Sequence, residues 1–199
     1  MAPAPVAALR RYVAVRPSKE RCDACGAGLP SEHIHQFDPK TRQIRCACDA
    51  CAVLYRDTYR DIPTAVRALP NFSMTDAQWD DLLIPISLAF FTYNSAVGRV
   101  IALYPGPAGA SESLLRLTAW EEIAADNPEL RDLQPDVEAL LVNRVGATRG
   151  YFLVPIDECY KLVGLIRMRW SGLSGGAAVW GEIAEFFDGL RRASHRRVG

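Results

Sequence analysis

Apolar positions dominate the second half of the chain, where they form short runs typical of strands. Ile86 to Tyr93 and Arg99 to Tyr104 are rich in β-branched and aromatic side chains, and Asn94 to Gly98 can turn the chain between them. Two such runs joined by a turn predict a β-hairpin, and the Pro- and Gly-rich stretch 105–109 is expected to form a loop. Further strands are expected over 113–117, 137–142 and 151–154.

Helices are predicted between and after these strands. Thr118 and Glu121 fit a capping box, in which the hydroxyl accepts from a first-turn N–H and the carboxylate reaches back. Asp157 is expected to cap a helix that carries Cys159 on its apolar side. Two other helix starts are expected, one at Ser174 and one over 76–81 with Ser73 or Thr75 as its cap.

The order of these elements favours an α+β fold: a small N-terminal zinc-ribbon-like module followed by an antiparallel sheet packed against helices on one face. The expected divisions are a flexible arm over 1–19, a metal-binding module over 20–56, a linker with short helices over 57–83, the α+β domain over 84–192 and a basic tail over 193–199.

Composition narrows the function classes. The 199 residues are 49% hydrophobic and 23% charged, as in ordinary globular proteins. Basic and acidic residues number 23 each, which argues against a dominant electrostatic nucleic-acid binder. No apolar run is long enough to span a bilayer, and the N-terminus is not a convincing signal peptide. We therefore expect a cytoplasmic protein with reduced thiols, in which clustered cysteines are more often metal ligands than disulfides.

The strongest chemical signal is a cluster of seven soft ligands between residues 22 and 51. Five of the six cysteines and two of the three histidines lie there. Two C-x2-C pairs separated by a short segment with a turn predict a tetrahedral thiolate site, with each pair forming a zinc knuckle. Four thiolates would close the coordination sphere and stabilise the module. The predicted ligands are Cys22, Cys25, Cys48 and Cys51.

A second candidate site uses His33, His35 and Cys46. If Pro39 and Lys40 form the centre of a hairpin turn, His33 lies directly opposite Cys46 and the three side chains share one face. Three ligands with a fourth position open would permit catalysis, metal transfer or completion by a partner. Two alternatives remain. The histidines could be exposed or support the first site with Cys46 as a small buried residue, or one histidine could replace a cysteine in a Cys3His site.

Spacing does not separate zinc from iron, because C-x2-C-G pairs also hold a single iron or an iron–sulfur cluster. Four functions therefore remain open: a zinc-binding accessory protein, an iron-containing electron carrier, a zinc-ribbon nucleic-acid binder and an enzyme that uses the open position. The nucleic-acid alternative would need a local basic patch from Arg42, Arg45, Arg56 and Arg60. Outside the cluster the only histidine is His195, so no catalytic residues are assigned.

Several motifs together resemble an uncharacterised bacterial family with an N-terminal Cys/His module. They include Arg21-Cys-Asp-Ala-Cys-Gly, Cys46-Ala-Cys-Asp-Ala-Cys51, the stretch from Tyr104 to Ser113 and Val154-Pro-Ile-Asp-Glu-Cys-Tyr. Members of that family are associated with gene clusters of nickel–iron hydrogenases. The resemblance implies an accessory role in hydrogenase assembly or operation, with another protein, such as a hydrogenase subunit, as partner.

Overall fold

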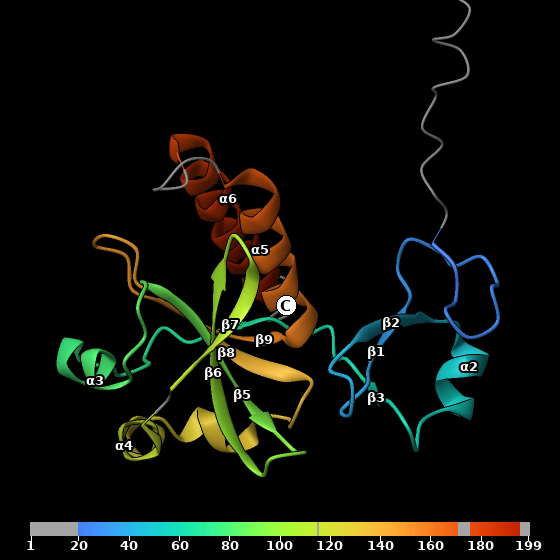
Figure 1. Cartoon of the computed structure of the whole chain (residues 1–199), viewed down its shortest axis with the longest axis horizontal. Helices are drawn as coiled ribbons and strands as arrows, with labels where there is room; N and C mark the ends of the chain where they lie inside the picture. The colour runs from blue at the N-terminus through green and yellow to red at the C-terminus, as the bar shows by residue number, and fades with distance from the viewer. Residues whose placement is uncertain (1–19, 115, 171–175, 196–199) are drawn as a thin grey trace, which may run out of the picture.

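The computed structural model describes residues 20–114, 116–170 and 176–195. In these ranges the chain forms a small β module next to a larger domain of sheet and helices (Figure 1). The predicted α+β class is confirmed. The arm over 1–19, Ser174 and the last four residues of the expected basic tail lie outside the described residues. No described helix is both long enough and apolar enough to cross a membrane.

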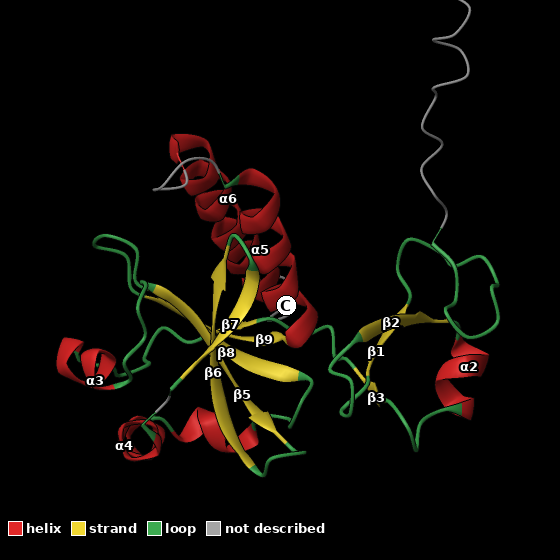
Figure 2. Ribbon diagram, in the orientation of Figure 1, coloured by secondary structure: helices red, strands yellow, loops and turns green. Residues whose placement is uncertain are grey.

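The larger domain is built on a six-stranded antiparallel sheet in the order β4-β9-β8-β5-β6-β7 (Figure 2). Strands β5, β6 and β7 follow one another as hairpins, and β8 and β9 form another hairpin. Pairing of β5 with β8 joins the two groups at the centre of the sheet. The bounds are β4 (Arg67–Ala68), β5 (Leu88–Asn94), β6 (Arg99–Gly106), β7 (Gly109–Ser113), β8 (Glu138–Asn143) and β9 (Gly150–Pro155).

Helices cover both faces of this sheet, so the expectation of one covered face is wrong. Phe90 belongs to the core under α5 and α6, whereas Phe91 belongs to the core that contains Trp79 of α3 and Trp120 of α4. Every residue of β8 and β9 is buried, and strands that are apolar on both sides require two cores. The helices are α3 (Asp76–Asp81), α4 (Leu117–Asp126), the 3-10 helix η1 (Pro128–Asp132), α5 (Ile156–Arg169) and α6 (Gly176–His195).

The stretch 105–109, expected to form a loop, instead forms the ends of β6 and β7 and the tight turn between them. Gly106 pairs with Gly109, so Pro107 and Ala108 alone form the turn. Gly109 has φ of 122°, a backbone conformation that side-chain-bearing residues rarely adopt. As a result β7 lies four residues earlier than the strand expected over 113–117.

Two predicted helix caps are wrong and one is confirmed. Helix α4 begins at Leu117, with Arg116 at the N-cap and no side-chain cap bond, so Thr118 forms no capping box. Pro155 precedes α5, which places Asp157 inside the first turn of that helix. Thr75 does cap α3, in a capping box with Gln78.

The N-terminal module contains a three-stranded sheet in the order β2-β1-β3. A short helix follows β2 in the chain. His35 pairs with Cys46, so the predicted pairing of His33 with Cys46 is wrong by two residues. The connection is not a two-residue turn: the Asp38 N–H donates to the Gln43 carbonyl, and the Asp38 carboxylate accepts from two further loop N–H groups. The elements are β1 (Ile34–Phe37), β2 (Ile44–Ala47), α2 (Asp49–Leu54) and β3 (Arg60–Asp61).

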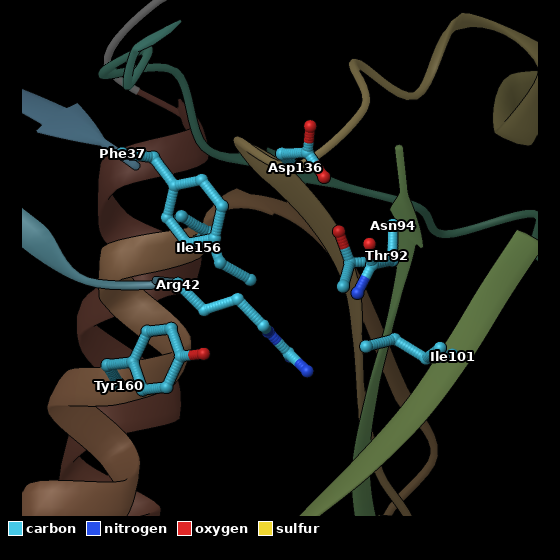
Figure 3. Close-up of a pocket in the computed structure, with 8 residues that line it drawn as sticks. All are labelled: Phe37, Arg42, Thr92, Asn94, Ile101, Asp136, Ile156 and Tyr160. Atoms are coloured by element: carbon cyan, nitrogen blue, oxygen red, sulfur yellow. The ribbon is translucent and has the colours of Figure 1, made fainter. Parts of the chain in front are cut away.

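The module packs directly on the larger domain. Phe37 is buried in the same core as Ile156 of α5, and Arg42 extends from the hairpin into the space between Tyr160 and β5 (Figure 3). A second contact joins Arg60 to Asp136 at 3.3 Å. The segment 57–83, interpreted from the sequence as a linker with short helices, supplies β3 to the module's sheet and β4 to the main sheet.

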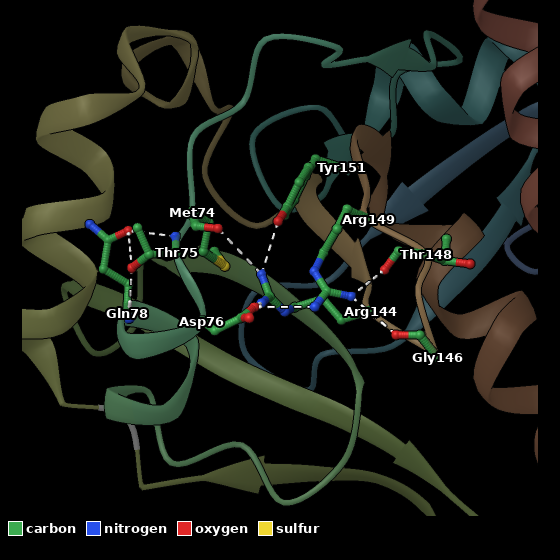
Figure 4. Close-up of polar contacts among 9 residues, drawn as sticks. All are labelled: Met74, Thr75, Asp76, Gln78, Arg144, Gly146, Thr148, Arg149 and Tyr151. Carbon is green, nitrogen blue, oxygen red and sulfur yellow. Dashed lines mark hydrogen bonds and ion pairs between the residues drawn. The ribbon is translucent and has the colours of Figure 1, made fainter.

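Arg144 holds α3 against the sheet. Its guanidinium donates to the Tyr151 hydroxyl at 3.0 Å and to the Met74 carbonyl at 3.4 Å, and it pairs with Asp76 (Figure 4). The Arg144 side chain is only 4% exposed, and its charge lies 5.4 Å from the ring of Trp79. Asp76 also pairs with Arg149, whose side chain is 42% exposed.

We expect Arg144→Ala to lower the free energy of unfolding by about 2–4 kcal/mol, because it leaves the buried Tyr151 hydroxyl and the partly buried Met74 carbonyl unpaired and opens a cavity. Arg149→Ala, which removes an exposed partner of the same carboxylate, should cost less than about 1 kcal/mol. Equilibrium denaturation by urea checks both values. Equal losses for the two variants would contradict the structural role given to Arg144.

Candidate metal centre

The first cysteine pair lies in a tight loop at the start of the module. Arg21 and Gly28 pair as an isolated β-bridge, and inside it the Cys22 N–H donates to the Ala27 carbonyl at 2.8 Å. The Gly26 N–H donates to the Cys22 carbonyl, and Gly26 has φ of 74°, in the left-handed region that favours glycine. The loop thus has a glycine turn after Cys25, at the place where the sequence predicts a knuckle.

The second pair lies at the start of a helix and not in a second knuckle. Cys48 is the N-cap residue of α2, and Cys51 lies in its first turn. The Ala52 N–H donates to the Cys48 carbonyl at 2.9 Å, which begins the helical bonding. Helical geometry places the residue three positions after the N-cap near the cap side chain, so both sulfur atoms can face the same point.

The four sulfur atoms of Cys22, Cys25, Cys48 and Cys51 lie within 4.8 Å of one another. Cys25 Sγ and Cys48 Sγ are 3.8 Å apart, which is too long for a disulfide bond. Zinc–sulfur bonds of about 2.3 Å in a tetrahedron place sulfur atoms about 3.8 Å apart. The cluster therefore has the donor set and the spacing to hold a metal ion, although the spacing does not identify the metal.

Hydrogen bonds shift the pKa values of two thiols in this cluster in opposite directions. A backbone N–H of Cys48, followed by that of Cys25, lowers the pKa of the Cys22 thiol to about 6. The bond from its own thiol to the Cys48 sulfur, together with burial, raises the pKa of Cys51 to about 12. The site thus already stabilises one thiolate, which is the form that binds metal.

The second set of candidate ligands, His33, His35 and Cys46, also lies together, with its donor atoms within 4.8 Å of one another. The two imidazole rings meet edge to face with centroids 4.8 Å apart. The register differs from the predicted one by two residues, and an even shift keeps the same side chains on the same face. Burial, and then the charges of Asp23 and Glu20, raise the pKa of the Cys46 thiol.

Sequence reasoning missed two carboxylates that position this second set. Asp157 Oδ2 accepts from His35 Nδ1 at 2.8 Å, although 122 positions separate the residues. Asp23 Oδ2 accepts from the Cys46 N–H at 2.6 Å. Asp23 lies inside the first C-x2-C pair, so its position in the chain indicated that it lies near the cluster. No neighbouring residue indicated this for Asp157, because only the packing of α5 on the module brings it to His35.

The remaining sequence candidates lie outside both clusters. Cys159 is fully buried in the core, as expected, and His195 ends α6. The four arginines of the proposed basic patch have partners within the chain: Arg45 lies over Tyr59 with 3.5 Å to the ring centroid, and Arg60 pairs with Asp136. Arg42 lies near Glu112, and Arg56 donates to the Val53 carbonyl. These contacts give no support to the nucleic-acid alternative.

Fold and site together define an α+β protein with a cysteine cluster able to hold a metal in its N-terminal module. The chain belongs to a family of unknown function, DUF5947, whose family model matches residues 21–194. The match covers both the module and the larger domain. No curated protein and no solved structure matches the chain.

Proposed function

We propose that Cys22, Cys25, Cys48 and Cys51 bind one zinc ion per chain, and that the protein is an accessory protein that acts by contact with another protein. The observation that carries the proposal is the meeting of four sulfur atoms from two separate C-x2-C pairs. A zinc ion with four thiolates has a complete coordination sphere and no bound water to activate, so this site stabilises structure and does not catalyse.

The nickel–iron hydrogenase system is the proposed setting. Its support is the motif resemblance of the chain, above all in Arg21 to Gly26 and Cys46 to Cys51. In this proposal the zinc module and the adjoining domain present one surface to a hydrogenase subunit or assembly factor. The cytoplasmic location expected from the sequence would keep the cysteines reduced and able to bind zinc.

Elemental analysis of purified protein tests the metal. We expect zinc in wild type, and we expect Cys22→Ser to lose the ion of this site together with the order of residues 20–56. The strands and helices from residue 84 onward should keep their secondary structure, because the two cores of the sheet lie mostly there. Cys159→Ala, which removes a cysteine outside the cluster, should retain the zinc. A brown or red protein with iron as its major metal would instead support the electron-carrier alternative.

Co-purification tests the accessory role. Tagged protein expressed in its own cells should retain another protein of the hydrogenase system, and Cys22→Ser should retain much less of it, since the module would no longer be ordered. Cys159→Ala serves again as the matched control. Equal recovery with wild type and Cys22→Ser would place the contact outside the module, and recovery of no hydrogenase-linked protein would argue against the proposed setting.

A further inference from the structure

The second cluster of ligands carries an inference of its own. We propose that His33, His35 and Cys46 bind a second metal ion, a divalent ion of borderline softness such as Zn²⁺, and that Asp157 is the carboxylate that orients His35 for it. The proposal does not depend on the role of the first site or on a protein partner. It depends on which ring nitrogens are already engaged.

His33 has one nitrogen engaged and one without a partner. Its Nδ1 lies 3.0 Å from the Pro30 carbonyl, and a carbonyl can only accept, so Nδ1 must carry the proton. In the neutral ring the lone pair is then on Nε2. His33 Nε2 is buried and has no hydrogen-bond partner among the described residues, and the side chain is only 4% exposed. A buried nitrogen without a hydrogen-bond partner is destabilising, and a metal ion at this position would be its partner.

His35 is held in the same way by a stronger acceptor. Asp157 Oδ2 accepts from His35 Nδ1 at 2.8 Å, which again leaves the lone pair on Nε2. A carboxylate that binds the far nitrogen of a metal-ligating histidine fixes the ring and raises the basicity of the ligating nitrogen. Asp157 is 14% exposed, and its other oxygen, Oδ1, is buried without a donor among the described residues. A cation on the opposite side of the imidazole would favour this carboxylate charge.

Cys46 supplies the third ligand from a fixed position. The Asp23 carboxylate accepts from the Cys46 N–H at 2.6 Å, and the Asp23 N–H donates to the Cys46 carbonyl at 2.9 Å. Strand pairing places Cys46 directly opposite His35. In the folded module these contacts fix the backbone on both sides of the site, as a preorganised metal site requires.

The donor set selects the ion and leaves one position open. Two imidazoles and one thiolate suit Zn²⁺ and its neighbours in the first transition row better than Mg²⁺ or Ca²⁺, which prefer oxygen. The site also carries negative charge for a cation: Asp23 lies beside Cys46, and Glu20 lies 3.5 Å from His33, while Lys161 lies 3.7 Å from Asp157. Three protein ligands leave a fourth position for water or an incoming donor, which the four-cysteine site does not.

The test is a metal count on the full chain. We saturate purified protein with Zn²⁺, remove loosely held ions by gel filtration and measure zinc per chain. Wild type should bind two zinc ions, and Cys46→Ser should bind one. The deciding value is the difference between the two proteins, which does not depend on the ion held by the four cysteines. Equal zinc counts for wild type and Cys46→Ser would overturn the proposal.

Asp157 is tested against its neighbour in the first turn of α5. Asp157→Asn and Glu158→Gln each remove one negative charge from the same helix end. Lys161 pairs with both carboxylates, whereas the acceptor of the hydrogen bond from His35 is Asp157. A Co²⁺ titration followed by thiolate-to-metal absorption should show the second ion bound roughly 10- to 100-fold more weakly in Asp157→Asn. Glu158→Gln should match wild type. Equal affinity in both variants would mean that His35 and Asp157 form only an ion pair.

Discussion

The N-terminal module depends on the meeting of four thiols from two parts of the chain. Between residues 20 and 56 the buried apolar side chains are Cys22, Phe37, Ala47, Cys51 and Ala52. Two of these are members of the cluster, and Phe37 packs into the core of the larger domain. So small an interior cannot offset the conformational entropy of thirty-odd ordered residues. A metal ion that joins both cysteine pairs would replace the missing core, as in other small metal-binding modules.

Hydrogen bonds and ring contacts then position the rest of the module around this point. Gln36 is fully buried in β1, where it accepts from Arg45 and donates to Asp61 and to the Ala52 carbonyl. One side chain thus connects the central strand to both neighbouring strands and to α2. Because every polar group of Gln36 has a partner, burying it fixes one arrangement of the elements instead of destabilising them.

The sequence predicts the features that depend on residues close together in the chain, and it misses those that depend on other contacts. The cysteine spacing and the residues on each hairpin face were predictable, since both follow from neighbours in the chain. The register was not, because Asp38 holds a longer loop by accepting from two backbone N–H groups. Thr118 matched a capping pattern, yet Arg116 takes the cap position. Consecutive apolar residues such as Phe90 and Phe91 are typical of a strand buried on both faces. The expectation of one covered face came from the order of elements and did not use this pattern.

The contact between His35 and Asp157 affects the order in which parts of the module can form during synthesis. All seven candidate ligands of the module leave the ribosome within thirty residues, whereas the carboxylate that accepts from His35 follows that histidine by 122 positions. At about 5–20 residues per second, the delay is on the order of ten seconds. In that interval the four cysteines are complete, but His35 still lacks its acceptor. A nascent chain can therefore bring the four cysteines together before α5 is made, whereas Asp157 can orient His35 only after that helix has been made.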